Sequence, residues 1–144
     1  MVLIDASTRW SHVCSYSTHN YVSARLLTQL IWIWAHFLDN PVKNIRLDNA
    51  SEFSSQAFNE YCMSIEIDNE HPLTHDYTQN GLAESFIKCI KQIARPLLVT
   101  SKLPIFTWGH AILHVVTLIR IRSTNYHNFS PLKFAFSQEP NKLI

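Results

Sequence analysis

The chain has 144 residues, of which 47% are apolar and 16% are charged. This composition excludes a disordered chain and allows one folded domain with a sizeable core. The formal net charge of +1 does not indicate nucleic-acid binding through bulk charge, so any basic surface must come from local clustering.

The cysteines and the apolar runs restrict the protein class further. The three cysteines are far apart and show neither a Cys-x-x-Cys nor a paired Cys/His spacing. We therefore expect no disulfide framework and no zinc site, but reduced core thiols in an intracellular protein. Residues 1–4 give no signal peptide, and the apolar run at residues 26–38 is too short and mixed to span a membrane.

The N-terminal residues predict a β-hairpin followed by a helix. Residues 2–4 are apolar, residues 5–9 are typical of a turn, and residues 10–16 alternate large with small or polar side chains. The first strand is so short that the chain is expected to begin within a domain. A helix is predicted over residues 21–38, with Asn20 as its N-cap.

The middle of the chain alternates predicted strands and helices. The apolar run at residues 44–47 predicts a strand that ends at Asp48. Ser54 or Ser55 begins the next helix, and the alternation at residues 65–68 predicts another short strand. Residues 71–78 form a polar loop.

Two helices are predicted in the C-terminal half, over residues 80–98 and 108–121. No repeat or linker is visible, so we expect one α/β domain over residues 1–125 and a further segment over residues 126–144. The chain has only two glycines, fewer than a fold with several tight turns normally uses.

The helix predicted from residue 80 carries charge on one face and apolar residues on the other. At about 100° per residue, an acid and three cations share a stripe: Glu84, Lys88, Lys91 and Arg95. The opposite face is expected to be buried: Leu82, Phe86, Cys89, Ile93 and Leu97. The stripe is either a solvated face whose i, i+4 pair contributes ~0.3–0.5 kcal/mol, or a surface for a polyanion.

Asp48 and Glu84 are separated by 35 residues, and each lies where an element ends or begins. Carboxylates in these positions can share a divalent cation, and their hard oxygen atoms suit Mg²⁺ or Mn²⁺. Two such ions can stabilise an in-line phosphoryl displacement. Asp48 taken alone is also typical of a residue that caps a turn.

Four segments resemble the DD(35)E integrase core, most closely that of copia-type retrotransposon integrases in plant Pol polyproteins. Residues 48–53 read Asp-Asn-x-x-Glu-Phe and residues 79–84 read Gln-Asn-Gly-Leu-Ala-Glu. Residues 5–10 resemble the hairpin turn of that family, and residues 130–140 contain its Ser-Pro and Phe-x-x-x-Pro signature. The resemblance covers nearly the whole chain.

The resemblance implies an RNase H-like α/β fold with a mixed sheet flanked by helices. It further implies Mg²⁺-dependent strand transfer of element DNA into target DNA, in the nucleus, with Asp48 and Glu84 as catalytic metal ligands. Asn80 would lie near the element end, and Lys88 and Lys91 would contact element DNA. Arg95 extends the same basic stripe.

The chain also departs from the family pattern. Ser7 and Arg9 align Asp5 with the hairpin turn, so the first catalytic Asp, its strand and the family's N-terminal zinc module are expected to be missing. Ala50 and Ser137 replace glycines, which costs ~1 kcal/mol or more wherever φ must be positive.

Three functions remain open. The chain is the catalytic core of an integrase, or an inactive remnant that binds nucleic acid through the basic stripe, or an interaction module that self-associates through the Trp-rich first helix. Because a two-metal site normally needs a third carboxylate, we expect no strand transfer from these residues alone. His110 and His114, at i, i+4, have no third ligand nearby in sequence and are expected to be packing or surface histidines.

Overall fold

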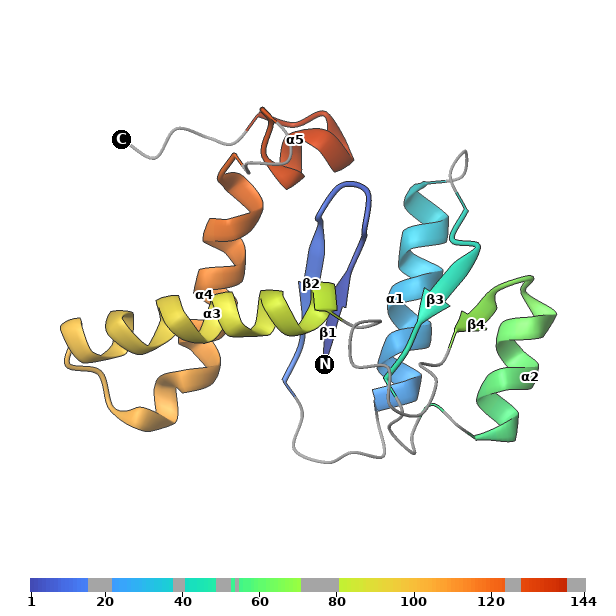
Figure 1. Ribbon diagram of the computed structural model, residues 1–144, viewed down its shortest axis with the longest axis horizontal. Helices are drawn as coiled ribbons and strands as arrows, with labels where there is room; N and C mark the ends of the chain where they lie inside the picture. Colours follow the sequence, from blue (N-terminus) through green and yellow to red (C-terminus); the bar gives the residue numbers. More distant parts are fainter. Residues whose placement is uncertain are drawn as a thin grey trace. The chain divides into compact units, whose positions relative to one another are not determined.

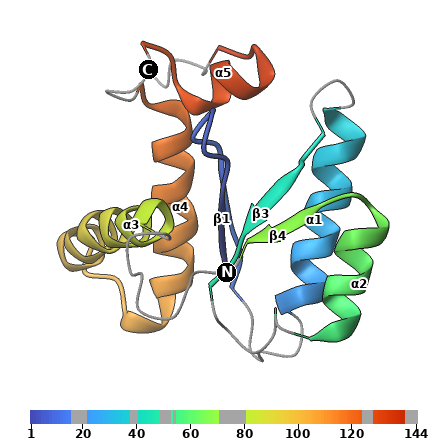
Figure 2. The same cartoon turned by 45° about the vertical axis from the view of Figure 1, so that its right-hand side comes forward.

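The computed structural model describes residues 1–15, 22–37, 41–48, 53, 55–70, 81–123 and 128–139. The chain divides into two compact units (Figures 1 and 2). Unit 1 comprises Met1–Ser15 and Leu82–Ile144, and unit 2 comprises Tyr16–Gly81. The predicted cap Asn20 and the predicted loop at 71–78 lie outside the described residues.

Unit 1 contains the predicted hairpin and both predicted C-terminal helices. β1 (Val2–Ile4) pairs antiparallel with β2 (Ser11–Val13). The helical elements are α3 (Gly81–Thr100), the 3₁₀ helix η2 (Ile105–Thr107), α4 (Trp108–Ile121) and α5 (Pro131–Phe136). The short α5 was not predicted; its N-cap Ser130 accepts a hydrogen bond from the Lys133 N–H at 3.2 Å.

The core of unit 1 lies between α3 and α4. The two helices contribute buried side chains to one cluster: Ile90, Ala94, Leu98, Ala111, Val115 and Val116. Val13 of β2 packs against this cluster. α4 also contacts α5, so it connects the hairpin, α3 and the C-terminal helix.

Arg120 joins the end of α4 to the hairpin. Its Nε donates a hydrogen bond to the Ser11 carbonyl oxygen at 2.7 Å, and its guanidinium lies 4.5 Å from the centre of the Trp10 ring. Trp10 in turn meets Phe136 of α5 edge to face, with ring centres 4.8 Å apart. Burial lowers the pKa of Arg120, which here contributes hydrogen bonding and stacking inside the fold.

Unit 2 contains α1 (Val22–His36) and a β–α–β segment. β3 (Asn44–Arg46) and β4 (Asp68–Glu70) are parallel, and α2 (Gln56–Ser64) connects them. Ser55 caps α2 by accepting a hydrogen bond from the Phe58 N–H at 3.3 Å, which confirms one of the two predicted caps. Arg46 and Glu70 are paired in register and form an ion pair at 2.8 Å.

The strand predicted at residues 65–68 is wrong, because α2 ends at Ser64, residues 65–67 form its C-terminal cap and β4 begins only at Asp68. The Glu66 N–H donates to the Met63 carbonyl at 3.1 Å, and the Ile67 N–H donates to the Cys62 carbonyl at 2.9 Å. These are the two bonds of a Schellman cap, in which an apolar residue follows the left-handed position. The cap places isoleucines two apart, and this spacing also occurs in a half-buried strand.

Three helices end on a non-glycine residue in the left-handed region. Glu66 has φ 55°, Lys102 has φ 50° and Ser137 has φ 55°, whereas neither glycine has a positive φ. Ser137 therefore occupies a position that favours glycine, in agreement with the family pattern, which has glycine there. Ala50, the other residue that replaces a glycine, lies outside the described residues. The left-handed conformation costs each of these side chains roughly 1–2 kcal/mol.

The three cysteines were expected to be core thiols, but they are not all buried. Cys62 is buried, Cys14 is half-buried and Cys89 is exposed; all three are free. Trp32 on α1 is exposed and stacks on His36, with ring centres 4.1 Å apart. Among the described residues, no helix combines the length and the apolar character needed to cross a membrane.

Candidate metal and nucleic-acid site

Glu84 lies in the first turn of α3, where the helix dipole favours a carboxylate. The residue is exposed, as the amphipathic pattern predicted. It forms no hydrogen bond or ion pair with the residues that the structure describes. Its carboxylate oxygens are thus available to a ligand.

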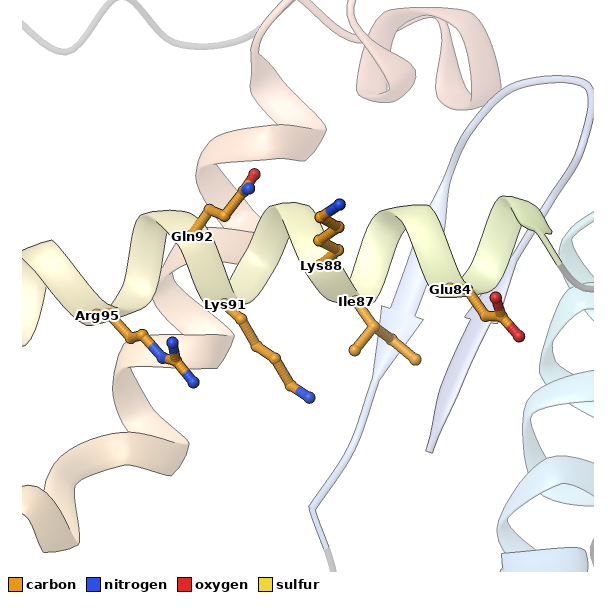
Figure 3. Close-up of a pocket in the computed structure, with 6 residues that line it drawn as sticks. All are labelled: Glu84, Ile87, Lys88, Lys91, Gln92 and Arg95. Carbon is orange, nitrogen blue, oxygen red and sulfur yellow. The ribbon is translucent and has the colours of Figure 1, made fainter.

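The three predicted cations are also exposed and lie on one face of α3 with Glu84, although their side chains diverge. Figure 3 shows Glu84, Ile87, Lys91 and Arg95 pointing to one side of α3, a set that we name the Glu84 row. Lys88 and Gln92 point to the other side and form the Lys88 row (Figure 3). Across the described part of α3 no ion pair joins Glu84 to Lys88, so the expected i, i+4 pair does not form.

The two rows together line an open hollow of about 430 Å³. We name this surface the open face of α3: Glu84, Ile87, Lys88, Lys91, Gln92 and Arg95. The sequence interpretation omitted Ile87 and Gln92. Both lie about 60–80° from Glu84 around the helix, so a wider angular window would have included them.

The buried face of α3 differs from the predicted one. Ile90 is 2% exposed and Ala94 is fully buried, whereas Leu82 is 38% and Ile93 is 40% exposed. Apolar residues cover most of the circumference of α3, so their periodicity alone did not determine which row packs against α4. The buried face therefore lies closer to the Glu84 row than expected.

Asp48 follows the last backbone hydrogen bond between β3 and β4, which runs from the Leu47 N–H to the Glu70 carbonyl at 3.0 Å. The residue is exposed, and its place at the end of a strand is confirmed. Asp48 belongs to unit 2 and Glu84 to unit 1, so their convergence on one metal ion stays a prediction. Asn80 lies outside the described residues.

Asp5 occupies the hairpin turn, as predicted. Its carboxylate accepts hydrogen bonds from the Thr8 N–H at 2.8 Å and from the Thr8 hydroxyl. The Ser7 N–H donates a longer bond to the same side chain at 3.5 Å. This carboxylate therefore organises the turn.

The donor types at Asp48 and Glu84 fit a hard divalent cation, because carboxylate oxygens are the ligands that Mg²⁺ and Mn²⁺ prefer. Within the ranges that the structure describes, no three metal-binding side chains gather in one place. His110 and His114 are both exposed on α4, in agreement with surface histidines.

Comparison with known proteins gives sequence relatives that include a transposon polyprotein. The chain is 36% identical over 78 residues to the retrovirus-related Pol polyprotein from transposon TNT 1-94 of Nicotiana tabacum. The match covers 54% of this chain and 6% of the polyprotein. No known protein-family profile matches the chain.

Solved structures show the same fold. A chain of the simian T-cell lymphotropic virus intasome, in complex with PP2A regulatory subunit B56 gamma, matches with a TM-score of 0.71 at 19% identity. That match covers 95% of this chain and 48% of the other. The HTLV-2 integrase catalytic core domain in complex with magnesium, in a trimeric form, matches with a TM-score of 0.64 at 22% identity, covering 93% of this chain and 82% of that domain.

These comparisons confirm the predicted mixed α/β, RNase H-like fold and the resemblance to a retrotransposon Pol polyprotein. The chain spans only a small part of that polyprotein, and the loss of a first strand with its acid stays a prediction. The protein therefore has the fold of retroviral integrase catalytic cores and is similar in sequence to part of a retrotransposon Pol polyprotein.

Proposed function

We propose that this chain is the integrase core portion of a copia-type Pol polyprotein and that it binds DNA along the open face of α3. The observation that carries the proposal is the set of three exposed cations behind Glu84. Lys88, Lys91 and Arg95 form no ion pair within the described part of the chain. Cations that are not neutralised by protein carboxylates are available to phosphates, and binding then releases counterions from the DNA.

Asp48 and Glu84 are the proposed ligands of Mg²⁺ or Mn²⁺. The HTLV-2 integrase core was solved in complex with magnesium, which is consistent with a divalent ion as the ligand of such a fold. When bound, the ion would neutralise charge that develops on a phosphoryl group during strand transfer. Glu84 contributes an exposed oxygen ligand at the start of a helix, and the cations behind it hold the DNA backbone close to that carboxylate.

A second candidate function is that of a catalytically inactive remnant that only binds nucleic acid. The hairpin turn favours it, because the Asp5 carboxylate already accepts hydrogen bonds from Thr8 within the turn. The two candidates share DNA binding and differ in strand transfer. They therefore need two experiments.

The first experiment measures DNA binding by fluorescence anisotropy with a labelled 20-base-pair duplex at several salt concentrations. If three cations contact phosphates, log K should fall with log [salt] with a slope of about −2 to −3. Lys91→Ala should reduce the size of the slope by about one. Lys43→Ala, which removes an exposed cation in unit 2, is the matched control. A slope that Lys91→Ala leaves unchanged would contradict binding along α3.

The second experiment tests joining of a labelled duplex end to a plasmid with Mg²⁺ or Mn²⁺. We expect no joined product from these 144 residues, because only two acids, Asp48 and Glu84, are proposed as ligands and a two-metal site normally needs a third carboxylate. A product that forms with Mn²⁺ and disappears in Glu84→Gln would instead establish the catalytic function.

The partners are proposed on the same basis. DNA of the element end and target DNA are the expected substrates, and Asn80 is the residue proposed to lie near the element end. The HTLV-2 cores were solved in trimeric and dimeric forms, which supports self-association of this chain as well. Action in the nucleus is proposed from the family resemblance alone.

A further inference from the structure

Gln92 is the one side chain of the open face of α3 that is polar and uncharged. It is exposed, and its amide forms no hydrogen bond with the residues that the structure describes. Figure 3 shows it on the same side of α3 as Lys88, one helical turn further along. Among the described residues, neither this amide nor the Lys88 ammonium group one turn away has a hydrogen-bond or ion-pair partner.

These two side chains suit different parts of a DNA duplex. Lysine contacts the phosphate backbone, which positions a protein on DNA but carries no sequence information. A glutamine amide can donate and accept at once, so it can bind N7 and N6 of adenine in the major groove. An α-helix about 10–12 Å across fits that groove, which is about 12 Å wide.

The geometry of α3 allows both contacts together. The helix has 20 residues, and its buried residues face α4, which leaves the open face for the ligand. Lys91 and Arg95 point to the other side of the open face (Figure 3), where they can follow the phosphates that flank the groove. Ile87 is apolar, so it can add contact area with the DNA but no hydrogen bond.

We propose that Gln92 is the base-reading residue of the open face and that it selects adenine at one position of a DNA duplex held by Lys88, Lys91 and Arg95. The inference rests on the proposed DNA binding and adds sequence preference to it. Gln92 is a specificity residue here, since it acts on the choice of DNA and not on the reacting phosphate.

The test is selection from a pool of 20-base-pair duplexes with a randomised centre, followed by sequencing of the bound fraction. The wild-type chain should enrich adenine at one position about fivefold or more, the range of one bidentate contact. Gln92→Ala should abolish this enrichment while leaving the salt dependence of binding unchanged. Lys91→Ala should keep the enrichment while reducing the salt slope by about one.

A second variant makes the test directional. Gln92→Glu should move the enrichment from adenine towards cytosine, because a carboxylate accepts from the N4 amine of cytosine. Gln138→Ala, which removes an exposed glutamine beyond α5, is the matched control and should keep the adenine preference.

The outcomes separate the inference from the proposed function. If the adenine enrichment persists in Gln92→Ala, the role of Gln92 is overturned and DNA binding stays intact. The same conclusion follows if the wild-type chain selects no base but still binds DNA with a salt slope that depends on Lys91. A chain that fails to bind the pool at low salt overturns both.

Discussion

The hairpin corner, which we define as residues 5–11 with Arg120, lies in the same unit as the open face of α3. The two regions carry the same kinds of charged group, but they differ in what these groups contact. In the hairpin corner, Asp5 accepts bonds from Thr8 and Arg120 bonds to Ser11 and stacks on Trp10. On the open face, Glu84 and Arg95 have no such partners among the described residues.

The difference separates charges that stabilise the fold from charges that are available to a ligand. A charged group already hydrogen-bonded inside the protein must break those bonds before it can bind anything else. The exposed charges of α3 need no such change, so they are the better candidates for metal and DNA. Matched substitutions in the two regions test this distinction through the free energy of unfolding.

The largest effect is expected beneath the open face, at Ile90. Ile90→Ala removes a side chain that is 2% exposed and should lower the free energy of unfolding by about 2–5 kcal/mol. Ile93→Ala, at a residue that is 40% exposed, should cost well under half as much. Urea denaturation of both variants measures the difference. Equal losses would show that the buried row of α3 is wrongly assigned.

The next largest effect is expected for the two arginines. Arg120→Ala removes the bond to the Ser11 carbonyl and the stacking on Trp10, and should cost about 2–3 kcal/mol. Arg95→Ala should change stability by less than about 0.5 kcal/mol while weakening DNA binding. Thermal unfolding and DNA-binding anisotropy on the same samples separate the two outcomes. An Arg120→Ala protein as stable as the wild type would contradict a stabilising role for Arg120.

Substituting the two acids should also cost different amounts of stability. The loss should again be larger in the hairpin than on α3, but the difference should be smaller than for the arginines. Asp5→Ala removes the acceptor of the turn bonds and should cost about 1 kcal/mol. Glu84→Gln removes only an exposed charge at a helix start, worth about 0.3–0.5 kcal/mol. Titration of Mn²⁺, followed by paramagnetic line broadening, should in contrast respond to Glu84→Gln and not to Asp5→Ala. A loss of Mn²⁺ binding in Asp5→Ala would identify Asp5 as a ligand.

The smallest effect is a gain, at the end of α5. Ser137→Gly places glycine at φ 55°, and should raise the free energy of unfolding by about 0.5–1 kcal/mol because the left-handed strain disappears. Ser123→Gly, at a residue without a positive φ, should not stabilise the protein. Differential scanning calorimetry measures the melting temperature of both variants. An equal rise in both would show that relief of backbone strain at Ser137 is not the cause.

Much of the local structure could be predicted from particular residues. The hairpin at residues 1–15, the cap at Ser55, the extent of α3 and α4 and the exposure of the basic side chains all follow from short-range patterns. The errors have local causes too. Ile65 and Ile67 resemble a strand because a Schellman cap also spaces apolar residues two apart, and Cys89 was assigned to a face of α3 that is not the buried one.

The sequence by itself determined the order of the elements, the open basic face of α3 and the placing of Asp5 in a turn, because each depends on residues within a few positions of one another. Only the tertiary structure decided which apolar row of α3 packs on α4 and how the stripe divides into the Glu84 and Lys88 rows. It also decided that Arg120 bonds to Ser11, a residue 109 positions away. Such contacts depend on which surfaces meet after folding, and periodicity along one helix carries no information about the partner.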